Sequence, residues 1–432
     1  MGRDFILGLS SKSKRKKEES LRAIHSLRSG NEFTLTSLAG VESKCLLGKG
    51  GFGEISLVKI AQLPQLCVLK KMLSAADEMV VASCYGEFKI QHRLFMNHRC
   101  FHRIPRPLYV LDCLDADFTG VYGFLMEFCA GGSVSAFAKT WCVDVKDESA
   151  DEGEEDYESS SDSDVFARDF DPLTLNPVKV ASLCVGMIEC LADVFKASRR
   201  LVHRDIKPEN FLVRVNPTDG ECNIVLADLG LAKIKHSISI SSNSVSFSSV
   251  SSISADPMDS GVLSEAESSP QSYAGTFAYS SCETIKFGES TQLSDAHSLG
   301  MSILALFLCK HPFIGHPLFQ SSQSISLKCM KYIYNMPELL KSGMVEGMLT
   351  RSRLFRSLET IEDGKFKPVL HCLNEVFQGL TRCDVEERMD VHTAREKVQL
   401  IKDLLPKIGE GWECPTEEEI IRMKIEQYGK SR

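Results

Sequence analysis

The chain has 432 residues, of which 43% are hydrophobic, and this is enough to bury one large core or two smaller ones. No stretch approaches the ~18–20 consecutive apolar residues of a membrane-spanning helix, so we expect no membrane span. The net charge is −8, but residues 144–171 hold 13 acidic and 2 basic residues and carry −11 of it. Removing that segment leaves about +3, and no nucleic-acid-binding surface is indicated.

The 16 cysteines are scattered along the chain without a C-x-x-C pair, and no secretory signal precedes them. Some of them, such as Cys67, Cys84 and Cys129, lie within apolar patterns and are expected to be small core residues. A reducing setting fits this composition better than a disulfide framework or a zinc site, and we therefore expect the cytoplasm.

Residues 1–40 are expected to form a basic arm. They include the basic run Lys12–Lys17, which is typical of a nuclear localisation signal or of a patch that binds anionic membranes. A solvated, disordered arm is the simpler interpretation. The nucleus therefore stands as the alternative location to the cytoplasm.

The first patterned element is Leu46–Ile60, where two apolar strands flank the glycine-rich turn Gly48-x-Gly50-x-Phe52-Gly53. Glycine allows backbone N–H groups to close over phosphate oxygens without obstruction by a Cβ atom. No Gly-Lys-Ser/Thr follows, so this is not a P-loop, and alone the pattern fits a plain glycine hairpin equally well. The next predicted strand, Cys67–Lys70, ends in a lysine, and alternation places Lys70 and Lys71 on opposite faces.

A helix is predicted over residues 75–96, because residues at helical spacing form one mostly apolar stripe there. Glu87 lies within this stripe. A carboxylate buried without a partner would be costly, so we expect Glu87 to pair with a cation. The stripe comprises Val80, Cys84, Glu87, Ile90, Gln91 and Leu94.

Two further strands are predicted at Pro105–Tyr109 and Gly123–Phe128, and helical spacing resumes over Thr174–Arg200. Between them lies the acidic segment 144–171, whose composition cannot bury enough apolar surface to offset chain ordering. We interpret it as a disordered insert. Its serines beside acids suit an acidophilic kinase, but a plain solvated loop is the favoured interpretation.

The most informative stretch is His203–Gly230. Phe211–Val215 and Asn223–Ala227 have strand character and flank a five-residue segment with strong turn chemistry. Asn210 lies nine residues before Asp219 and Asp228 nine residues after it, so if these strands pair antiparallel, the side chains of Asn210 and Asp228 meet at the open end of the hairpin, close to Asp205. Two carboxylates and a carboxamide suit Mg²⁺, with one acid left to orient a hydroxyl.

Beyond the hairpin, 16 of the 36 residues in 237–272 are serine, and this low complexity predicts disorder. Asp295 then begins a helix that is apolar nearly all round, which places the helix in the middle of a domain. Asp295 could serve as its N-cap. Thr416–Glu419 is a capping-box sequence that predicts a short terminal helix.

The residues His203–Asn210 match the pattern H-R-D-x-K-x-x-N in full. Together with Asp228-Leu229-Gly230, where most members have D-F-G, they resemble the catalytic and metal loops of eukaryotic-type protein kinases of the serine/threonine type. A surface hairpin would explain the turn residues but not this whole set. The glycine-rich turn and the Cys67–Lys70 strand likewise resemble the kinase glycine-rich loop and V-A-I-K strand. The resemblance covers roughly residues 41–405.

This resemblance implies an α+β, bilobal protein-kinase-like fold. A small, mainly antiparallel β lobe with one key helix would span residues 41–128. A larger, mainly helical lobe would span residues 129–405 and contain the inserts 144–171 and 237–272. A C-terminal tail with a short helix would occupy residues 406–432.

The resemblance also implies a role for individual residues. Asp205 would orient the acceptor hydroxyl, Lys207 would contact the γ-phosphate, and Lys70, held by Glu87, would bind the α/β-phosphates of ATP. Asn210 and Asp228 would hold Mg²⁺. The residues implied in nucleotide binding are Gly48, Lys49, Gly50, Gly51, Phe52, Gly53, Ile55, Lys70, Met126, Glu127 and Cys129.

Gly275–Glu283 resembles the substrate-binding end of a kinase activation segment, with Ser281-Cys282-Glu283 where A-P-E is usual. The resemblance implies an ion pair between Glu283 and Arg388, and loss of the proline should loosen the turn without removing the pair. It also implies that Asp295 anchors the catalytic loop from below.

The function implied is transfer of the γ-phosphate of Mg-ATP to serine or threonine hydroxyls of protein substrates. Arg204 before Asp205 is typical of kinases that are activated by phosphorylation, so we expect an upstream kinase to act on 237–272. The alternative is a pseudokinase or nucleotide-binding scaffold without turnover, which Leu229 and Cys282 favour. A small-molecule kinase is disfavoured by Gly275-Thr276.

Overall fold

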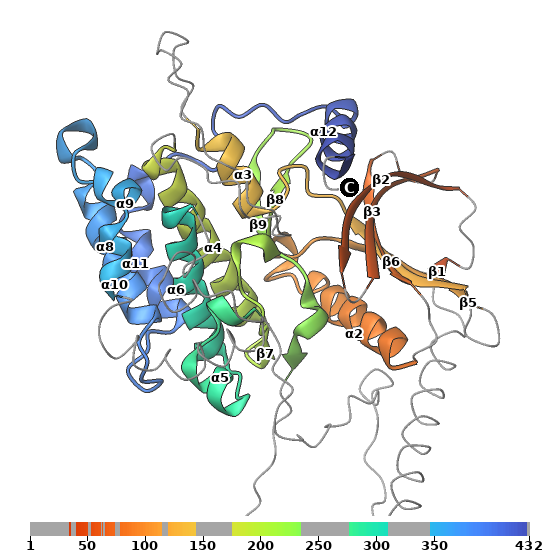
Figure 1. Ribbon diagram of the computed structural model, residues 1–432, viewed down its shortest axis with the longest axis horizontal. Helices are drawn as coiled ribbons and strands as arrows, with labels where there is room; N and C mark the ends of the chain where they lie inside the picture. Colours follow the sequence, from red (N-terminus) through yellow and green to blue (C-terminus); the bar gives the residue numbers. More distant parts are fainter. Residues whose placement is uncertain are drawn as a thin grey trace, which may run out of the picture. The chain divides into compact units, whose positions relative to one another are not determined.

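The computed structural model describes residues 34–35, 40–50, 53–61, 63, 65–73, 78–114, 120–143, 175–234, 276–309 and 346–429. Two compact units emerge (Figure 1). The smaller contains the described residues up to Lys89 together with Pro107–Met126, and the larger contains Ile90–Arg106, Glu127–Lys233 and the described residues that follow Tyr273. The predicted inserts 144–171 and 237–272, the basic run Lys12–Lys17, and the site residues Gly51 and Phe52 lie outside the described residues.

The smaller unit is built on a six-stranded sheet with the order β1-β5-β6-β4-β3-β2. The pairs β2–β3, β3–β4 and β5–β6 are antiparallel, and β1 pairs with β5 in parallel. The two later strands are longer than the predicted 105–109 and 123–128. The strands are β1 Thr34–Leu35, β2 Val41–Gly50, β3 Gly53–Ile60, β4 Cys67–Leu73, β5 Pro107–Leu114 and β6 Gly120–Glu127.

Strand β1 falls within the segment 1–40 that was expected to be disordered. Thr34 and Leu35 pair with Val110 and Leu111, and Leu35 packs against buried residues of the sheet. These two residue pairs, together with the packing of Leu35, extend the sheet to residues that precede the predicted start of the smaller lobe at residue 41. The prediction of an entirely disordered arm was wrong at these two residues.

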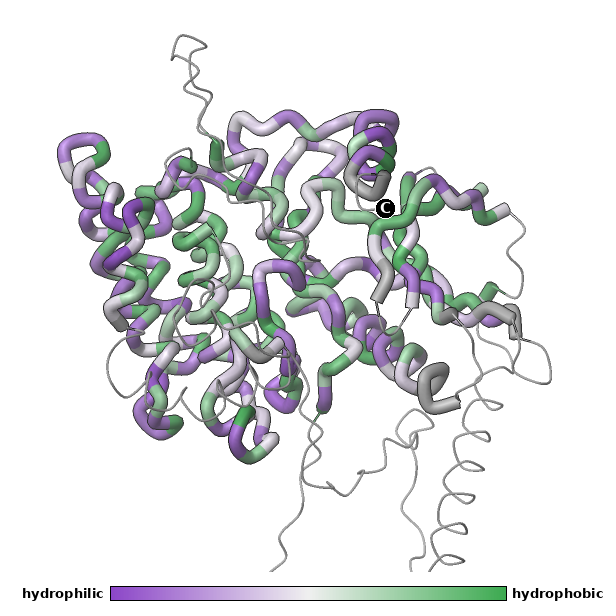
Figure 2. Tube along the Cα trace, in the orientation of Figure 1, coloured by the Kyte–Doolittle hydropathy of each residue, from purple (hydrophilic) through white to green (hydrophobic). Residues whose placement is uncertain are grey.

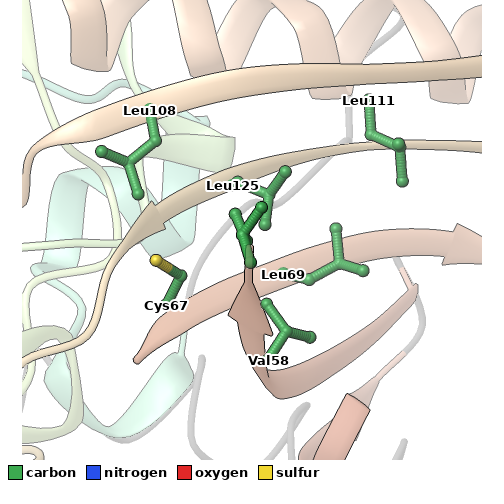
Figure 3. Close-up of a cluster of buried hydrophobic side chains, with 7 residues drawn as sticks. Val58, Cys67, Leu69, Leu108, Leu111 and Leu125 are labelled. Carbon is green, nitrogen blue, oxygen red and sulfur yellow. The ribbon is translucent and has the colours of Figure 1, made fainter. Parts of the chain in front are cut away.

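Each face of this sheet buries its own hydrophobic cluster. On one face, side chains from β3, β4, β5 and β6 pack together, as Figure 3 shows for Val58, Leu69 and Leu125. On the other face lies helix α2 (Glu78–Phe95), whose Cys84 and Phe88 pack against Phe124, with the Phe88 and Phe124 ring centroids 5.8 Å apart. Period-two alternation along β4 therefore leaves Lys70 on the face opposite to Leu69.

The larger unit is mainly helical, and two nearly fully buried helices, α4 (Pro177–Ala197) and α6 (Gln292–Leu308), form its core. Figure 2 shows hydrophobic residues dense along α4. Helix α4 begins at Pro177 rather than at Thr174 because the Asn176 side chain caps it, accepting hydrogen bonds from the next two N–H groups. The other helices are α3 Val134–Trp141, α5 Cys282–Phe287, α8 Glu346–Arg351, α9 Arg353–Ser357, α10 Lys367–Leu380, α11 Val391–Gln399 and α12 Glu417–Gly429.

Two small β elements accompany these helices. β8 (Phe211–Val215) and β9 (Cys222–Leu226) form an antiparallel hairpin, and β7 (Leu201–Val202) pairs with β10 (Lys233–Ile234). A sheet with one helix in the smaller unit and a mainly helical larger unit confirm the predicted α+β, bilobal fold class.

The chain after residue 405 packs on the larger unit rather than leaving it. The indole N–H of Trp141 donates to the carbonyl of Glu410 at 3.0 Å, and the ring of Trp412 meets Phe137 edge-on at 4.9 Å. Helix α12 begins with the predicted capping box, in which Thr416 and Glu419 exchange hydrogen bonds. No helix in the described part of the chain is long and apolar enough to cross a membrane.

Candidate active site

The hairpin β8–β9 forms as predicted, but its register differs by one residue. Phe211 pairs with Leu226, so Asn210 lies opposite Ala227, whose N–H donates to the Asn210 carbonyl at 2.9 Å. Asp228 is the next residue along. The N–H of Asn216 donates to the carbonyl of Glu221 at 2.9 Å, so the turn is centred between Thr218 and Asp219 rather than on Asp219. Asn210 and Asp228 therefore lie at the same end of the hairpin without being cross-strand partners.

Asp205 is the centre of a dense hydrogen-bond network. Its Oδ1 accepts from the backbone N–H of Thr276 at 3.0 Å and from the Thr276 hydroxyl at 2.8 Å. Its Oδ2 lies 2.8 Å from Nζ of Lys207 and 3.0 Å from Nδ2 of Asn210. Lys207 in turn donates to the Thr276 hydroxyl at 2.9 Å. Asp205, Lys207, Asn210 and Thr276 thus form one connected cluster in the larger unit.

The His203 ring contacts both the catalytic loop and the end of β9. Its Nε2 lies 3.0 Å from the Ala227 carbonyl, and its Nδ1 accepts from the Asp205 N–H at 3.4 Å. Burial lowers the pKa of His203, so the imidazole is neutral, with the proton on Nε2 donated to Ala227. The ring therefore ties the loop that carries Asp205 to the strand that ends before Asp228.

Asp295 holds the same loop from a third element. Its two carboxylate oxygens accept from the backbone N–H groups of His203 at 2.6 Å and Arg204 at 2.8 Å. Burial raises the pKa of Asp295 to about 7, and these two hydrogen bonds oppose that shift. Arg204 has a positive φ of 70°, and the two bonds hold this strained turn in place.

These two bonds confirm the implied role of Asp295 as an anchor of the catalytic loop, whereas the interpretation of Asp295 as a helix cap was wrong. Helix α6 begins earlier, at Gln292, and its N-cap is Thr291, which exchanges hydrogen bonds with Ser294. Asp295 lies inside the first turn, where its carboxylate is directed to the loop instead. The capping box Thr291–Ser294 was missed because serine rather than Glu or Gln occupies its last position.

Lys70 and Glu87 pair within the smaller unit, as predicted. Nζ of Lys70 on β4 lies 2.8 Å from each carboxylate oxygen of Glu87 on α2. Glu87 is only 5% exposed, so this lysine supplies the cation that its burial requires. Gly123 on β6 allows β6 and β4 to approach closely beside Lys70, because a Cβ atom at Gly123 would overlap the Lys70 carbonyl.

The glycine-rich turn joins β2 and β3, and its backbone is paired up to the turn itself, with Gly50 opposite Gly53. Ile55 lies opposite both Gly48 on β2 and Lys70 on β4. Gly53 has a φ of 143°, and a Cβ atom there would overlap the Lys71 carbonyl, so this position requires glycine. The turn and Lys70 are therefore joined through one continuous strand, β3.

The residues at the end of β6 have separate roles in packing. Met126 packs against the hydrophobic cluster below α2, and Cys129 is buried, which raises the pKa of its thiol and makes it unreactive. Glu127 forms a bidentate ion pair with Arg214, with both oxygens 2.7 Å from guanidinium nitrogens. Its Oε2 also accepts from the Arg106 N–H at 2.8 Å. The Glu127 side chain is therefore committed to structure.

The predicted ion pair between Glu283 and Arg388 is confirmed. The guanidinium nitrogens lie 2.6 and 3.1 Å from the two carboxylate oxygens, and the Arg388 side chain is wholly buried. Burial alone would raise the pKa of Glu283, but the hydrogen bonds and charge of Arg388 outweigh it and hold that pKa well below its usual value. This pair fixes the start of α5 to the loop before α11.

The arrangement of these residues matches the site that the kinase resemblance implied, and comparison with known proteins leads to the same family. A model of the protein kinase domain matches residues 41–394. The chain belongs to the protein kinase domain family. The kinase resemblance read from His203–Asn210 is therefore confirmed.

Two similar kinases come from a plant and a yeast. The chain is 23% identical over 278 residues to mitogen-activated protein kinase kinase 1 of Arabidopsis thaliana, which covers 64% of this chain and 57% of that protein. It is 23% identical over 294 residues to the MAP kinase kinase skh1/pek1 of Schizosaccharomyces pombe, covering 67% of this chain and 60% of that protein. The chain thus matches less than two thirds of the length of either relative.

Membership of the kinase family implies ATP and Mg²⁺, and the residues at the hairpin fit a metal ion. Both hydrogen bonds of the Asn210 amide nitrogen go to Asp205, at 2.7 and 3.0 Å, which leaves the amide oxygen as a ligand. Asp228 adopts the left-handed conformation, with φ 55° and ψ 67°. No group of three or more His, Cys, Asp or Glu suited to a metal occurs among the described residues.

The ion pair of Arg214 with Glu127 was not predicted from the sequence. Arg214 is the fourth of the five residues of β8, where strand alternation predicts an exposed position and gives no hint of a partner. Its partners lie far away in sequence: Glu127, and the carbonyls of His102 and Ile104 at 3.1 and 2.5 Å. An arginine inside an otherwise apolar strand run was the one available signal.

Proposed function

We propose that this chain is a serine/threonine protein kinase that transfers the γ-phosphate of Mg-ATP to hydroxyl groups of protein substrates. The observation that carries the proposal is the cluster around Asp205, in which Lys207, Asn210 and Thr276 all bond to one carboxylate. A structural salt bridge would need one cation. This carboxylate instead has its two oxygens directed separately, one toward the lysine and amide, the other toward a hydroxyl.

In this proposal, Asp205 accepts a hydrogen bond from the substrate hydroxyl and orients it for in-line attack. The Thr276 hydroxyl, 2.8 Å from Oδ1, demonstrates that this carboxylate accepts from an alcohol at normal hydrogen-bonding distance. Lys207 would stabilise the charge on the transferred phosphoryl group, since its ammonium group lies beside the same carboxylate.

The nucleotide would be held by three sets of residues. Lys70, positioned by Glu87, would bind the α/β-phosphates, and the backbone of Gly48–Gly53 would close over the phosphates, with Ile55 and Met126 beside the base. The backbone of Glu127 and Cys129 would bind adenine. Asn210 and Asp228 would hold Mg²⁺, which when bound neutralises charge on the phosphate oxygens.

The preference for serine and threonine rests on the contact between Lys207 and Thr276. Thr276 also donates its backbone N–H to Asp205, so the backbone at the start of this segment lies close to the Asp205 carboxylate. A substrate held along this segment would then need only a short side chain to bring its hydroxyl to Asp205. A serine or threonine hydroxyl is carried closer to its backbone than a tyrosine hydroxyl. The two relatives are named as kinases of mitogen-activated protein kinases, so a protein kinase is a reasonable substrate to test first.

Regulation by phosphorylation is part of the proposal and is supported by two cations, Arg204 and Lys233, whose charges repel each other. The positive charge of Arg204 lowers the pKa of Lys233, and burial lowers it further. No described acidic side chain is hydrogen-bonded to Lys233. A phosphate group carried by the segment 237–272, between Lys233 and Thr276, would relieve this repulsion and order the segment.

The alternative is a pseudokinase that binds nucleotide without turnover. Leu229 in place of phenylalanine was the main reason to consider it. Leu229 is only 1% exposed, so it fills a buried position as an aromatic residue would. Since no charged residue of the site is substituted, turnover is the favoured function.

The test is ATP-dependent phosphorylation of a generic protein substrate by the wild type and two variants. Asp205→Asn should lower the rate by at least ~10²-fold, the typical contribution of a group that handles a proton in the transition state. Asp219→Asn, an exposed aspartate in the turn of the same hairpin, should leave the rate unchanged. Equal loss in both variants, or activity that survives Asp205→Asn, would remove the assignment. Inactivity of the wild type would favour the scaffold.

A further inference from the structure

Two cysteines lie side by side next to the Glu283–Arg388 ion pair. Cys282 is the first residue of α5, and Cys383 lies in the loop between α10 and α11. Their sulfur atoms are 3.5 Å apart, although the residues are separated by 101 positions in the sequence. The proposed phosphate transfer uses neither thiol.

Backbone contacts fix both residues at this distance. Glu283, directly after Cys282, is held by the guanidinium group of Arg388. The same guanidinium group donates to the carbonyl of Cys383 at 3.3 Å and to that of Arg382 at 2.7 Å. One buried arginine therefore binds the neighbourhoods of both cysteines, and the sulfur contact follows from an ordered arrangement rather than from two mobile side chains.

The two thiols differ in accessibility. Cys282 is buried, with 6% of its surface exposed, whereas Cys383 is partly exposed. Burial, followed by the proximity of Cys383, raises the pKa of the Cys282 thiol, so little thiolate is present there. A dissolved oxidant would therefore meet Cys383 first, and Cys282 would react only with its neighbour.

We propose that Cys282 and Cys383 are a dithiol that a small-molecule disulfide, such as glutathione disulfide, converts to an intramolecular disulfide, tying the end of the Thr276–Glu283 segment to the loop before α11. This inference does not depend on the proposed phosphate transfer. It assigns a covalent modification site to the position where most kinases carry a proline.

The reaction balances in two exchange steps. The thiolate of Cys383 attacks one sulfur of glutathione disulfide, that S–S bond breaks, and one glutathione leaves and takes up the proton that Cys383 released. The sulfur of Cys282 then loses its proton and attacks Sγ of Cys383, and the second glutathione leaves as a thiol. The protein loses two hydrogens, and one glutathione disulfide becomes two glutathione thiols. The second step is aided by proximity, since a 3.5 Å separation is close to attack distance.

Closing the disulfide requires the sulfur atoms to approach from 3.5 Å to ~2.05 Å. Small rotations of the two side chains can share this movement, and the backbone contacts of Arg388 need not break. In a reducing cytoplasm the pair would stay as thiols and close only when the ratio of glutathione disulfide to glutathione rises. The disulfide would then join covalently the start of α5 and the loop before α11, which the Glu283–Arg388 ion pair already holds together.

The test uses the full-length protein, incubated under native conditions in buffers of increasing glutathione disulfide, then alkylated and digested with trypsin without reduction. Trypsin releases Cys383 in the peptide 383–388 and Cys282 in the peptide 236–286, and each peptide contains one cysteine. We expect these two peptides joined, with a mass lower by two hydrogens than their sum. We also expect a thermal midpoint higher by about 2 °C or more, lost again on adding dithiothreitol.

Two matched variants complete the experiment. Cys383→Ser should abolish the joined peptides and the thermal shift, whereas Cys372→Ser, at another partly exposed cysteine, should leave both unchanged. A mixed disulfide of glutathione with Cys383 and no joined peptides would overturn the proposal. So would crosslinking that occurs only in urea, or no reaction at Cys383 while the exposed Cys414 is modified. The wild-type peptide map decides the matter even if a variant folds poorly.

Discussion

The Glu283–Arg388 pair offers a quantitative test of how the larger unit is held together, through the substitution Arg388→Met. Methionine has a similar length, so the change removes charge and hydrogen bonds more than volume. The wild-type guanidinium group makes two bonds to Glu283 and three to the carbonyls of Arg382, Cys383 and Leu293. Since Arg388 is wholly buried and the Glu283 side chain is only 12% exposed, removing one partner leaves a buried charge. We expect a loss of about 3–5 kcal/mol in the free energy of unfolding at pH 7.

The loss should depend on pH. In the wild type the pKa of Glu283 lies below its unfolded value, so the pair stabilises the fold above about pH 4.3 and that contribution is lost as pH falls through the folded pKa. In Arg388→Met the lowering by the arginine is gone, and burial, the largest cause, raises the pKa of Glu283 although hydrogen bonds from Ser281 and Ser294 remain, so the folded state favours the protonated acid. The deficit of the variant should therefore shrink by about 1 kcal/mol between pH 7 and pH 5.

The assay is urea unfolding followed by tryptophan fluorescence, because both tryptophans, Trp141 and Trp412, belong to the larger unit. Arg382→Met is the control: its ion pair with Glu387 joins two exposed side chains and should cost at most ~1 kcal/mol. Arg388→Lys keeps the charge and should cost less than the methionine variant. A deficit for Arg388→Met no larger than that of Arg382→Met, or one that grows toward pH 5, would refute the reasoning.

Three further outcomes are expected. Glu87→Gln removes the charge that pairs with Lys70 and should lower kcat/KM for ATP about 10–100-fold in a kinase assay, with little change in the urea midpoint. Arg214→Met leaves Glu127 without its guanidinium partner and should destabilise the larger unit by about 1–3 kcal/mol in urea unfolding. Deleting residues 406–432 removes the packing of the tail on α3 and should lower stability by at least about 2 kcal/mol in the same assay; unchanged stability would mean that the tail is an appendage.

Local patterns in the sequence predicted much of this molecule. The hairpin strands, the helix carrying Glu87 and the terminal capping box each depend on residues within one helix, one hairpin or one helix start, and each formed. The pairing of Lys70 with Glu87 could also be predicted, because a carboxylate on an apolar stripe demands a cation and β4 supplied one on the correct face.

The failures share a different cause. From its neighbours alone Asp295 looked like a helix cap, and only the kinase resemblance implied the anchor role that the structure shows, in which its carboxylate binds backbone groups 92 and 91 residues away in His203 and Arg204. Glu127 and Arg214, separated by 87 residues, gave no sign of each other, since an exposed position suits either alone. The hairpin register slipped by one because turn residues fix where strands reverse only to within a residue. Contacts between distant residues leave little trace in local patterns, and the Glu283–Arg388 pair, 105 residues apart, was predicted only through the kinase resemblance.

Parallel measurement of nucleotide binding and phosphate transfer in the wild type and Asp205→Asn tests the central claim most directly. If Asp205 orients the acceptor hydroxyl, the variant should bind Mg-ATP within a few-fold of the wild type while transferring phosphate at least ~10²-fold more slowly. Phosphate transfer by Asp205→Asn at the wild-type rate would contradict the account.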